Sequence, residues 1–307
     1  MSELDLAVLV HLDDPGPQPQ ALVDAARARG IAASRWTMRS LSGSFDGERL
    51  TCCYEGRPVA PGIVLTQGLN RSWPLAAQLL GAAVATGTEV VNPISGSSVA
   101  LDKVATAVAL GAASVPTLRF QVHPWGARQL SEPSFPAPYV TKPTGGSNGR
   151  GVLDHPDWPA AAAWLGADRA LGPTGEIGAE LLQPLASGLE RRVLVMDGRA
   201  RAIVARRPLT GIVASWRNAE AWAIEDPEAA RVAVAAVDAL GLAYGAVDLI
   251  DLGDRCAVLE VNCWPRDLEV LGRLCGVNLF EALLDLVLAR RRSPSAAPPL
   301  EGGDGNS

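Results

Sequence analysis

Residues 245–262 have the sequence GAVDLIDLGDRCAVLEVN, which predicts two apolar strands joined by a tight turn. Three oxygen-bearing side chains interrupt these strands: Asp248 on the first, and Glu260 and Asn262 on the second. Glu260 and Asn262 are two positions apart and project from one strand face, and Asp248 can project beside them from the paired strand. An acid and an amide flanking a buried valine are costly unless they coordinate or hydrogen-bond a partner.

These side chains indicate a site for a hard metal ion. Magnesium is held by few carboxylates together with phosphate oxygens and water, whereas zinc prefers His and Cys. We therefore expect Asp248, Glu260 and Asn262 to bind Mg²⁺, with Mn²⁺ as an alternative ion. The competing interpretation is that the acids merely end their strands.

A glycine-rich segment follows the strand predicted over 136–142, which ends at Lys142. Residues 143–151 have the sequence PTGGSNGRG and offer backbone N–H groups without side-chain obstruction, as a loop over polyphosphate requires. The loop returns to a strand, so it fits neither the phosphate loop that opens a helix nor the dinucleotide fingerprint. Taken alone, a surface hairpin explains it equally well.

Residues 180–183, ELLQ, predict an apolar strand whose edge can offer backbone groups to adenine. Glu190 follows a few residues later and can accept hydrogen bonds from ribose hydroxyls. A core strand followed by an exposed acid is an equal alternative for this segment.

The composition of the chain is that of an ordinary globular protein: 307 residues, of which 48% are hydrophobic and 20% charged. Its net charge of −6 argues against nonspecific nucleic-acid binding. Residues 1–10 lack a signal-peptide pattern, no stretch has transmembrane length, and the five cysteines lack paired metal-ligand spacing. We expect a cytoplasmic protein with reduced thiols and without nucleic-acid or membrane partners.

Strands alternate with helices in the first third of the chain, which indicates a mostly parallel sheet. Expected strands there cover 4–10, 62–65 and 89–91, and expected helices cover 20–29, 74–85 and 101–113. Farther along, strands are expected at 117–122, 136–142, 178–182, 191–195, 200–205, 243–250 and 256–261, and helices at 157–165, 227–240 and 279–291.

In this order and spacing, the motifs resemble the ATP-grasp superfamily, in particular its branch of ribosomal-protein glutamate ligases and lysine-biosynthesis carrier-protein ligases. The resemblance covers residues 90–290. No single piece is specific, but the order of the pieces is. They are Asn92-Pro93, Leu101-Asp102-Lys103, Val115-Pro116-Thr117, 140–143, the glycine-rich loop, 188–193, 245–248 and 259–262.

The resemblance implies an α/β protein with the ATP-grasp fold, in which a parallel α/β domain precedes two α+β subdomains that clasp ATP. The implied domains are the N-terminal substrate-side domain at 1–95, a central lid with the glycine-rich loop at 96–177, a C-terminal subdomain with the metal site at 178–292, and a disordered tail at 293–307. The implied activity is that of an ATP-dependent carboxylate–amine ligase. Such an enzyme forms an amide or peptide bond through an acyl phosphate and releases ADP and phosphate.

The resemblance also assigns site residues. The implied phosphate contacts are Lys103, Lys142, Gly145, Gly146, Ser147 and Gly149. The implied adenine hinge is Glu180, Leu181 and Leu182, with Glu190 on the ribose and Asp248, Glu260 and Asn262 on magnesium. Candidates for stabilising the transferring phosphoryl group or the oxyanion are Arg192, Arg206, Arg217 and Asn218.

Three departures from the family pattern concern the substrates. Leu181 replaces a common acid at the hinge, and Arg266 follows Pro265 where glycine is usual. Where a Gly-Gly pair is expected after Asn218, the chain has Ala219-Glu220-Ala221-Trp222. The last two fall near the expected substrate, so the substrate should differ from those of the named relatives. We predict that Arg266 grips an anionic group bidentately. An ion pair with Asp267 or Glu269 is the alternative.

Several alternatives stay open for the function. A non-catalytic nucleotide-binding module would share the fold, and a macrocyclase-type ligase would act on a precursor peptide. A carrier-protein ligase would need a basic patch, which the net acidity disfavours.

The expected partners are small carboxylates and amines, amino acids or a peptide, and a homo-oligomer is compatible with the sequence. The three histidines have no motif partner for a hydrolytic triad.

Overall fold

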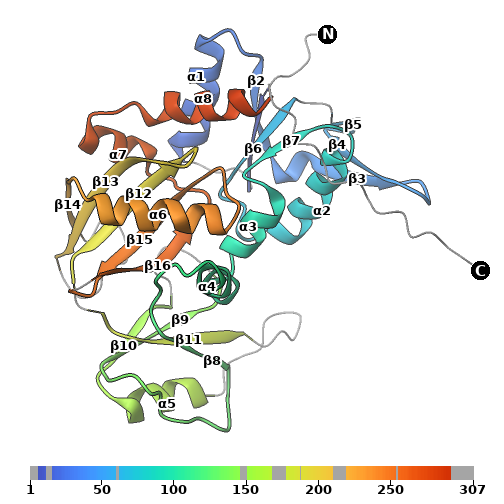
Figure 1. Cartoon of the computed structure of the whole chain (residues 1–307). Coiled ribbons are helices and arrows are strands. Elements are labelled where there is room, and N and C mark those ends of the chain that lie inside the picture. The colour runs from blue at the N-terminus through green and yellow to red at the C-terminus, as the bar shows by residue number, and fades with distance from the viewer. Residues whose placement is uncertain are drawn as a thin grey trace, which may run out of the picture.

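The computed structural model describes residues 6–11, 16–59, 62–145, 151–167, 178–186, 188–209, 219–253 and 255–291. These residues form three layered regions (Figure 1). None of their helices is long and apolar enough to cross a membrane. The expected tail, 293–307, lies outside the described residues.

The N-terminal region is built on a parallel sheet with strand order β2-β1-β6-β7. Every residue of β1 and β6 is buried, because helices α1 and α2 cover opposite faces of the sheet. This matches the expected alternation of strands and helices. The elements are β1 (Leu6–Val10), α1 (Pro17–Ala28), β2 (Ala33–Thr37), β6 (Ile63–Gln67), α2 (Trp73–Val84) and β7 (Glu89–Val91).

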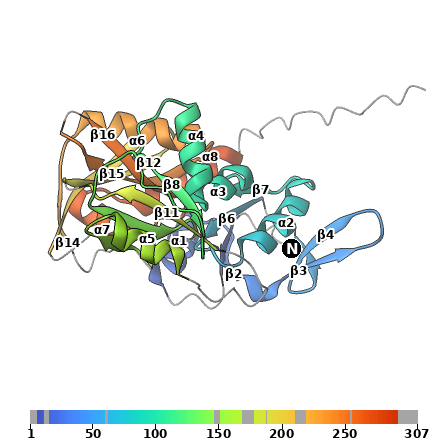
Figure 2. The ribbon, with the colours of Figure 1, turned by 90° about the horizontal axis from the view of Figure 1, so that it is seen from below.

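A small antiparallel sheet lies between β2 and β6, where no element is expected from the sequence. A 3₁₀ turn at Met38–Ser40 leads into it, and Figure 2 shows its first two strands projecting as a hairpin. Trp36 stacks on Tyr54 at 4.1 Å between ring centroids and anchors the base of the hairpin. The strands are β3 (Leu41–Phe45), β4 (Leu50–Tyr54) and β5 (Arg57–Pro58).

The central lid is an antiparallel sheet with order β10-β9-β11-β8, packed on α5. Asp102 caps α4 by accepting hydrogen bonds from the N–H groups of Val104 and Ala105, which makes α4 begin at Lys103. Strand β11 belongs to this sheet although it follows the expected boundary at residue 177. The elements are α3 (Ile94–Ala100), α4 (Lys103–Ala112), β8 (Gln121–Pro124), β9 (Tyr139–Pro143), β10 (Leu153–His155), α5 (Trp158–Gly166) and β11 (Ala179–Pro184).

The C-terminal region is an antiparallel sheet with order β14-β13-β12-β15-β16. Helix α6 packs on one face, and α7 and α8 pack on the other. Asp197 and Gly198 both have positive φ, as the predicted hairpin turn between β12 and β13 requires. The elements are β12 (Glu190–Met196), β13 (Arg199–Pro208), β14 (Ala219–Ala223), α6 (Pro227–Ala239), β15 (Tyr244–Asp251), β16 (Cys256–Asn262), α7 (Leu268–Cys275) and α8 (Leu279–Arg291).

Asn92 ties the N-terminal and C-terminal regions together. Its amide nitrogen donates to the carbonyls of Tyr244 and Cys263 at 2.9 and 2.8 Å. Its oxygen accepts from the N–H groups of Ala243 and Tyr244 at 2.8 and 3.0 Å. The side chain is fully buried, so these four bonds satisfy every polar atom of the amide and fix how the two sheets meet.

Candidate active site

A pocket lies between the lid and the C-terminal sheet. Its walls come from α4, from β9 and β11 of the lid, and from β16 of the C-terminal sheet. The polar side chains in the wall are Lys103, Thr106, Thr117, Lys142, Gln183 and Glu260. The structure therefore brings both predicted phosphate-binding lysines and one predicted magnesium ligand into a single pocket.

Lys142 lies at the centre of this arrangement. Its Nζ donates to the carbonyl of Leu259 on β16 at 3.4 Å, across the gap between the two sheets. Burial lowers the pKa of Lys142 to about 8, although the nearby Glu260 carboxylate raises it in part, and Lys103 lowers it further. The backbone N–H of Lys103 donates to the carbonyl of Thr144, which holds α4 beside the start of the glycine-rich loop. An incoming polyphosphate would meet two cations and favour the charged form of Lys142.

The predicted adenine hinge on β11 presents alternate side chains to the pocket. Leu181 and Gln183 line it. Leu182 points the other way into the lid core, and Glu180 accepts a hydrogen bond from the indole of Trp125 at 3.2 Å. Of the predicted hinge side chains, Leu181 is therefore the one that can contact a base, and contacts from Glu180 and Leu182 would have to use backbone atoms.

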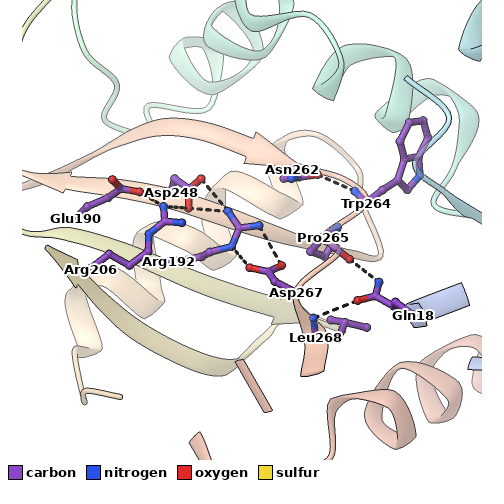
Figure 3. Close-up of polar contacts among 10 residues, drawn as sticks. All are labelled: Gln18, Glu190, Arg192, Arg206, Asp248, Asn262, Trp264, Pro265, Asp267 and Leu268. Carbon is purple, nitrogen blue, oxygen red and sulfur yellow. Dashed lines mark hydrogen bonds and ion pairs between the residues drawn. The ribbon is translucent and has the colours of Figure 1, made fainter. Parts of the chain in front are cut away.

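Five charged residues of alternating sign form a row on one face of the C-terminal sheet (Figure 3). Arg206 pairs with Glu190 and with Asp248 Oδ1, the latter at 2.8 Å. Arg192 Nη1 donates to both oxygens of Asp248 at 2.8 Å. The other edge of Arg192 meets Asp267, with Nη2–Oδ1 at 3.2 Å and Nε–Oδ2 at 2.6 Å. We call these five residues the charged row.

Strand register explains the charged row. Glu190 lies opposite Arg206, Arg192 opposite Asp248, and Asp248 opposite Glu260, so all of these side chains emerge from one face. Burial alone would raise the pKa of Asp248, but Arg192 and Arg206 outweigh it and hold that pKa below its ordinary value. Asp248 is therefore ionised at neutral pH and carries its charge toward the magnesium candidates.

The residues present fit a magnesium ion that arrives with a nucleotide. Glu260 is half-buried, and in the described part of the chain no hydrogen bond or ion pair engages its carboxylate. Asn262 accepts a hydrogen bond from the Trp264 N–H at 3.1 Å, which fixes its side chain. The described residues hold no group of three His, Cys, Asp or Glu able to bind a metal by themselves. A donor set this small suits magnesium, which keeps phosphate oxygens and water as ligands.

Asp248 differs from the other two predicted magnesium ligands, because both of its oxygens already accept hydrogen bonds from guanidinium groups. Its direct contact with a metal stays a prediction. The ribose role of Glu190 also stays a prediction, since its carboxylate is buried against Arg206. Gly145 is exposed at the start of the loop, and Arg266 is exposed just beyond Pro265. Further predicted residues lie outside the described ranges: Gly146, Ser147, Gly149, Arg217 and Asn218.

The contacts of two residues near the site, Asp267 and Gln18, were not predicted from the sequence. Asp267 was considered as a partner for Arg266 alone, yet it pairs with Arg192. Gln18, on α1, donates to the carbonyl of Pro265 at 2.7 Å and accepts from the N–H of Leu268 at 3.2 Å. The polar Asp267 at the start of a strongly amphipathic helix was a usable signal for a helix terminus. Gln18 had no local signal, because its partners lie about 250 residues away.

The fold can be compared with known proteins. No family model and no curated protein matches the sequence. Solved structures do match. The ATP-grasp ligase PsnB complexed with a minimal precursor has a TM-score of 0.70 at 20% identity, covering 94% of this chain and 100% of that chain.

Two further matches come from other ligase structures. D-alanine–D-alanine ligase from Bacillus anthracis, complexed with ATP, has a TM-score of 0.68 at 15% identity, with 95% of this chain and 99% of that chain covered. A RimK domain ATP-grasp protein from Sphaerobacter thermophilus has a TM-score of 0.66 at 22% identity, with 92% and 99% covered. At such identities the likeness establishes the fold, and the chemistry has to be argued from the site. The chain has the ATP-grasp fold over nearly its whole length, as the order of its motifs predicted.

Proposed function

We propose that this protein is an ATP-dependent, magnesium-requiring ligase that activates a carboxylate as an acyl phosphate and joins it to an amine. The observation that carries the proposal is the pocket that Lys103 of α4, Lys142 of β9 and Glu260 of β16 line together. Two cations opposite one uncommitted carboxylate suit a polyphosphate with a bridging magnesium ion. The charged row continues from this pocket along the same sheet face through Asp248.

The nucleotide would lie between the lid and the C-terminal sheet. Lys103 and Lys142 neutralise its phosphates, and the backbone N–H groups of Gly145, Gly146, Ser147 and Gly149 are the further phosphate contacts that we propose from the sequence. Leu181 packs on the base. Glu260 and Asn262 hold magnesium, which when bound supplies charge cancellation at the phosphates. The pocket walls exclude water from the transferring group.

A carboxylate is a poor electrophile until an oxygen of the carboxylate takes the terminal phosphoryl group of ATP and ADP leaves. The amine nitrogen then bonds to the acyl carbon, the bond from that carbon to the phosphate oxygen breaks, and phosphate leaves as the amine loses a proton. Arg192 and Arg206 keep positive charge beside this centre, and Arg217 and Asn218 are proposed to complete it. The chain therefore contributes alignment and charge more than covalent chemistry.

The proposed substrates are a small carboxylate and an amine, in the first place amino acids. Arg266 is exposed where the chain leaves β16, and its guanidinium can grip a free carboxylate. A peptide acceptor is the alternative within the same reaction, and PsnB is a ligase solved with a precursor peptide. Both substrate classes require the same acyl phosphate.

The test is a screen of purified protein for ADP release with amino acids, small carboxylates and peptides, alone and in pairs. Amide products are identified by mass spectrometry. The proposal predicts ADP, phosphate and an amide in equal amounts, with a strict requirement for magnesium. Release of AMP and pyrophosphate would exclude an acyl phosphate. ATP binding without turnover in every pair would favour the non-catalytic nucleotide-binding alternative.

A further inference from the structure

Arg192 is held on two edges by two carboxylates that belong to different parts of the chain. Nη1 bonds Asp248 on the neighbouring strand, while Nη2 and Nε meet Asp267 in the segment that follows Asn262. The exposed fractions of the three side chains are 7% for Arg192, 15% for Asp248 and 8% for Asp267. A guanidinium gripped on both edges has one orientation, and that orientation sets where Asp248 lies beside Glu260.

The segment that carries Asp267 is fixed from the N-terminal region. Gln18 donates to the Pro265 carbonyl and accepts from the Leu268 N–H, one contact on each side of Asp267 (Figure 3). Gln18 also donates to Gln67 Oε1 at 3.0 Å, which ties it to the end of β6. Gln18 is 6% exposed, so water competes little for these bonds.

The same segment adjoins the predicted metal ligands. Trp264 donates its backbone N–H to Asn262 and its indole N–H to Thr66 Oγ1 at 2.9 Å. It also packs edge-on against Trp73 at 5.0 Å between ring centroids. Contacts of Trp264, Pro265 and Leu268 therefore link the segment that follows Asn262 to the N-terminal region.

We propose that Asp267 is a positioning residue: its carboxylate fixes Arg192, and Gln18 fixes Asp267, so that docking of the N-terminal region sets the geometry of the charged row. Asp267 itself need touch neither nucleotide nor substrate. Its effect on turnover rests on the proposed ligase function. Its effect on Arg192 does not, and the two can be measured apart.

The experiment removes the carboxylate and offers it back as a free anion. In Asp267→Gly, formate should occupy the vacated place beside Arg192 and raise the thermal unfolding midpoint. The midpoint of the double variant Asp267→Gly with Arg192→Gln should not respond to formate. The matched control is Asp251→Gly, which removes a carboxylate from Arg191, the neighbouring arginine on the opposite face. Equal formate responses in the single and double variants would overturn the proposal.

Turnover supplies the second readout. Asp267→Gly should lower kcat about 100-fold with little change in the KM for ATP, and formate should restore kcat in a saturable way. Asp267→Asn keeps the volume of the side chain and should show the loss without rescue, which covers the case in which the glycine variant does not fold. Gln18→Leu should lower kcat without response to formate.

The outcomes separate the two claims. Wild-type kcat in Asp267→Asn would overturn the positioning role. A wild-type protein that releases no ADP with any substrate would overturn the proposed function, while the thermal measurement would still decide whether Asp267 fixes Arg192. A formate-dependent rise in the kcat of Asp251→Gly as large as that of Asp267→Gly would show a general anion effect and overturn the positioning role.

Discussion

Two adjacent arginines on β12 each form ion pairs with two aspartates, but the two groups lie on opposite faces of the sheet and differ in solvent exposure. Arg191 pairs with Asp226 and Asp251, and Arg192 pairs with Asp248 and Asp267. They point to opposite faces of the sheet because successive side chains of a strand alternate. Asp251 is 35% exposed, whereas each carboxylate on Arg192 is at most 15% exposed. The side chain of Arg191 is itself 15% exposed, against 7% for Arg192.

The partners explain what each arginine does. Asp226 caps α6 by accepting from the Ala229 N–H, and Asp251 accepts from the Gly253 N–H in a turn. Arg191 therefore joins a helix end to a turn, which is a structural task. Of the partners of Arg192, Asp248 lies opposite Glu260 and is itself a predicted metal ligand, and Asp267 lies five residues after Asn262. Residue type and partner count are the same, so it is the position relative to the pocket that separates a structural pair from a functional one.

The largest expected effect is on kcat, and it should distinguish Glu260, on the Arg192 face of the C-terminal sheet, from Asp251 on the Arg191 side. Glu260→Gln removes the carboxylate charge that is proposed to hold magnesium, and it should lower kcat about a thousandfold, or about 4 kcal/mol in the barrier, without unfolding the protein. Asp251→Asn, on the Arg191 side, should leave kcat nearly unchanged. Steady-state ADP release by both variants checks this, and retained activity in Glu260→Gln would remove its assignment as a ligand.

The next largest difference is expected in stability, when each of the two arginines is replaced by alanine. Arg192→Ala removes the shared cation from two buried carboxylates, Asp267 and Asp248, of which Asp248 keeps its pair with Arg206. It should lower the free energy of unfolding by about 3 to 5 kcal/mol. Arg191→Ala, in a wetter site, should lower it by about 1 kcal/mol. Denaturant unfolding of the two variants gives the comparison. Equal decreases in the free energy of unfolding would show that the greater burial of Arg192 and its carboxylates does not strengthen their contribution to stability.

Lys142 should give the ATP affinity a pH dependence. Its pKa of about 8 in the free protein lies below the ordinary lysine value, and phosphate favours the charged form. Above about pH 8, binding must take up a proton, so affinity should fall by up to about tenfold per pH unit. Arg stays charged, and Lys142→Arg should flatten this dependence. Titrations of ATP binding from pH 7 to pH 9.5 test it, and identical profiles would exclude Lys142 as the titrating group.

The smallest expected effect concerns Arg266. Because this side chain is exposed, Arg266→Ala should weaken transition-state binding of the anionic substrate by about 1 kcal/mol, or about fivefold in kcat/KM. Arg266→Lys should recover a part of the loss, since it keeps the charge but not the bidentate geometry. Unchanged kinetics in both variants would show that Arg266 is a surface charge without a role in substrate binding.

The predictable part of the site was the part set by local pattern. The apolar strands β15 and β16 leave one register that buries their valines, and this register places Asp248 opposite Glu260 as expected. The glycine-rich segment and the strand that carries Lys142 were found for the same reason. Each of these features depends on a pattern of a few consecutive residues, so it can be predicted from the sequence.

The rest depends on contacts that no local pattern encodes. Gln18 meets Pro265 across 247 positions, and Asp267 pairs with Arg192 across 75 positions. Strand β3 was missed because four of its five residues are exposed and its apolar alternation is weak. The lid boundary was placed ahead of β11 because a strand does not reveal which sheet it will join. Pairing with β8 and β9 decides that.

An acyl phosphate intermediate would transfer one oxygen of the carboxylate substrate to the released phosphate, and an isotope label can follow that oxygen. A carboxylate substrate found in the ADP-release screen is labelled with a heavy oxygen isotope on both carboxylate oxygens and turned over with ATP, magnesium and the amine. If the carboxylate is activated as an acyl phosphate, each amide formed should be accompanied by one labelled oxygen in the released phosphate, with the other retained in the amide. Unlabelled phosphate, or label found in AMP together with release of pyrophosphate, would contradict it.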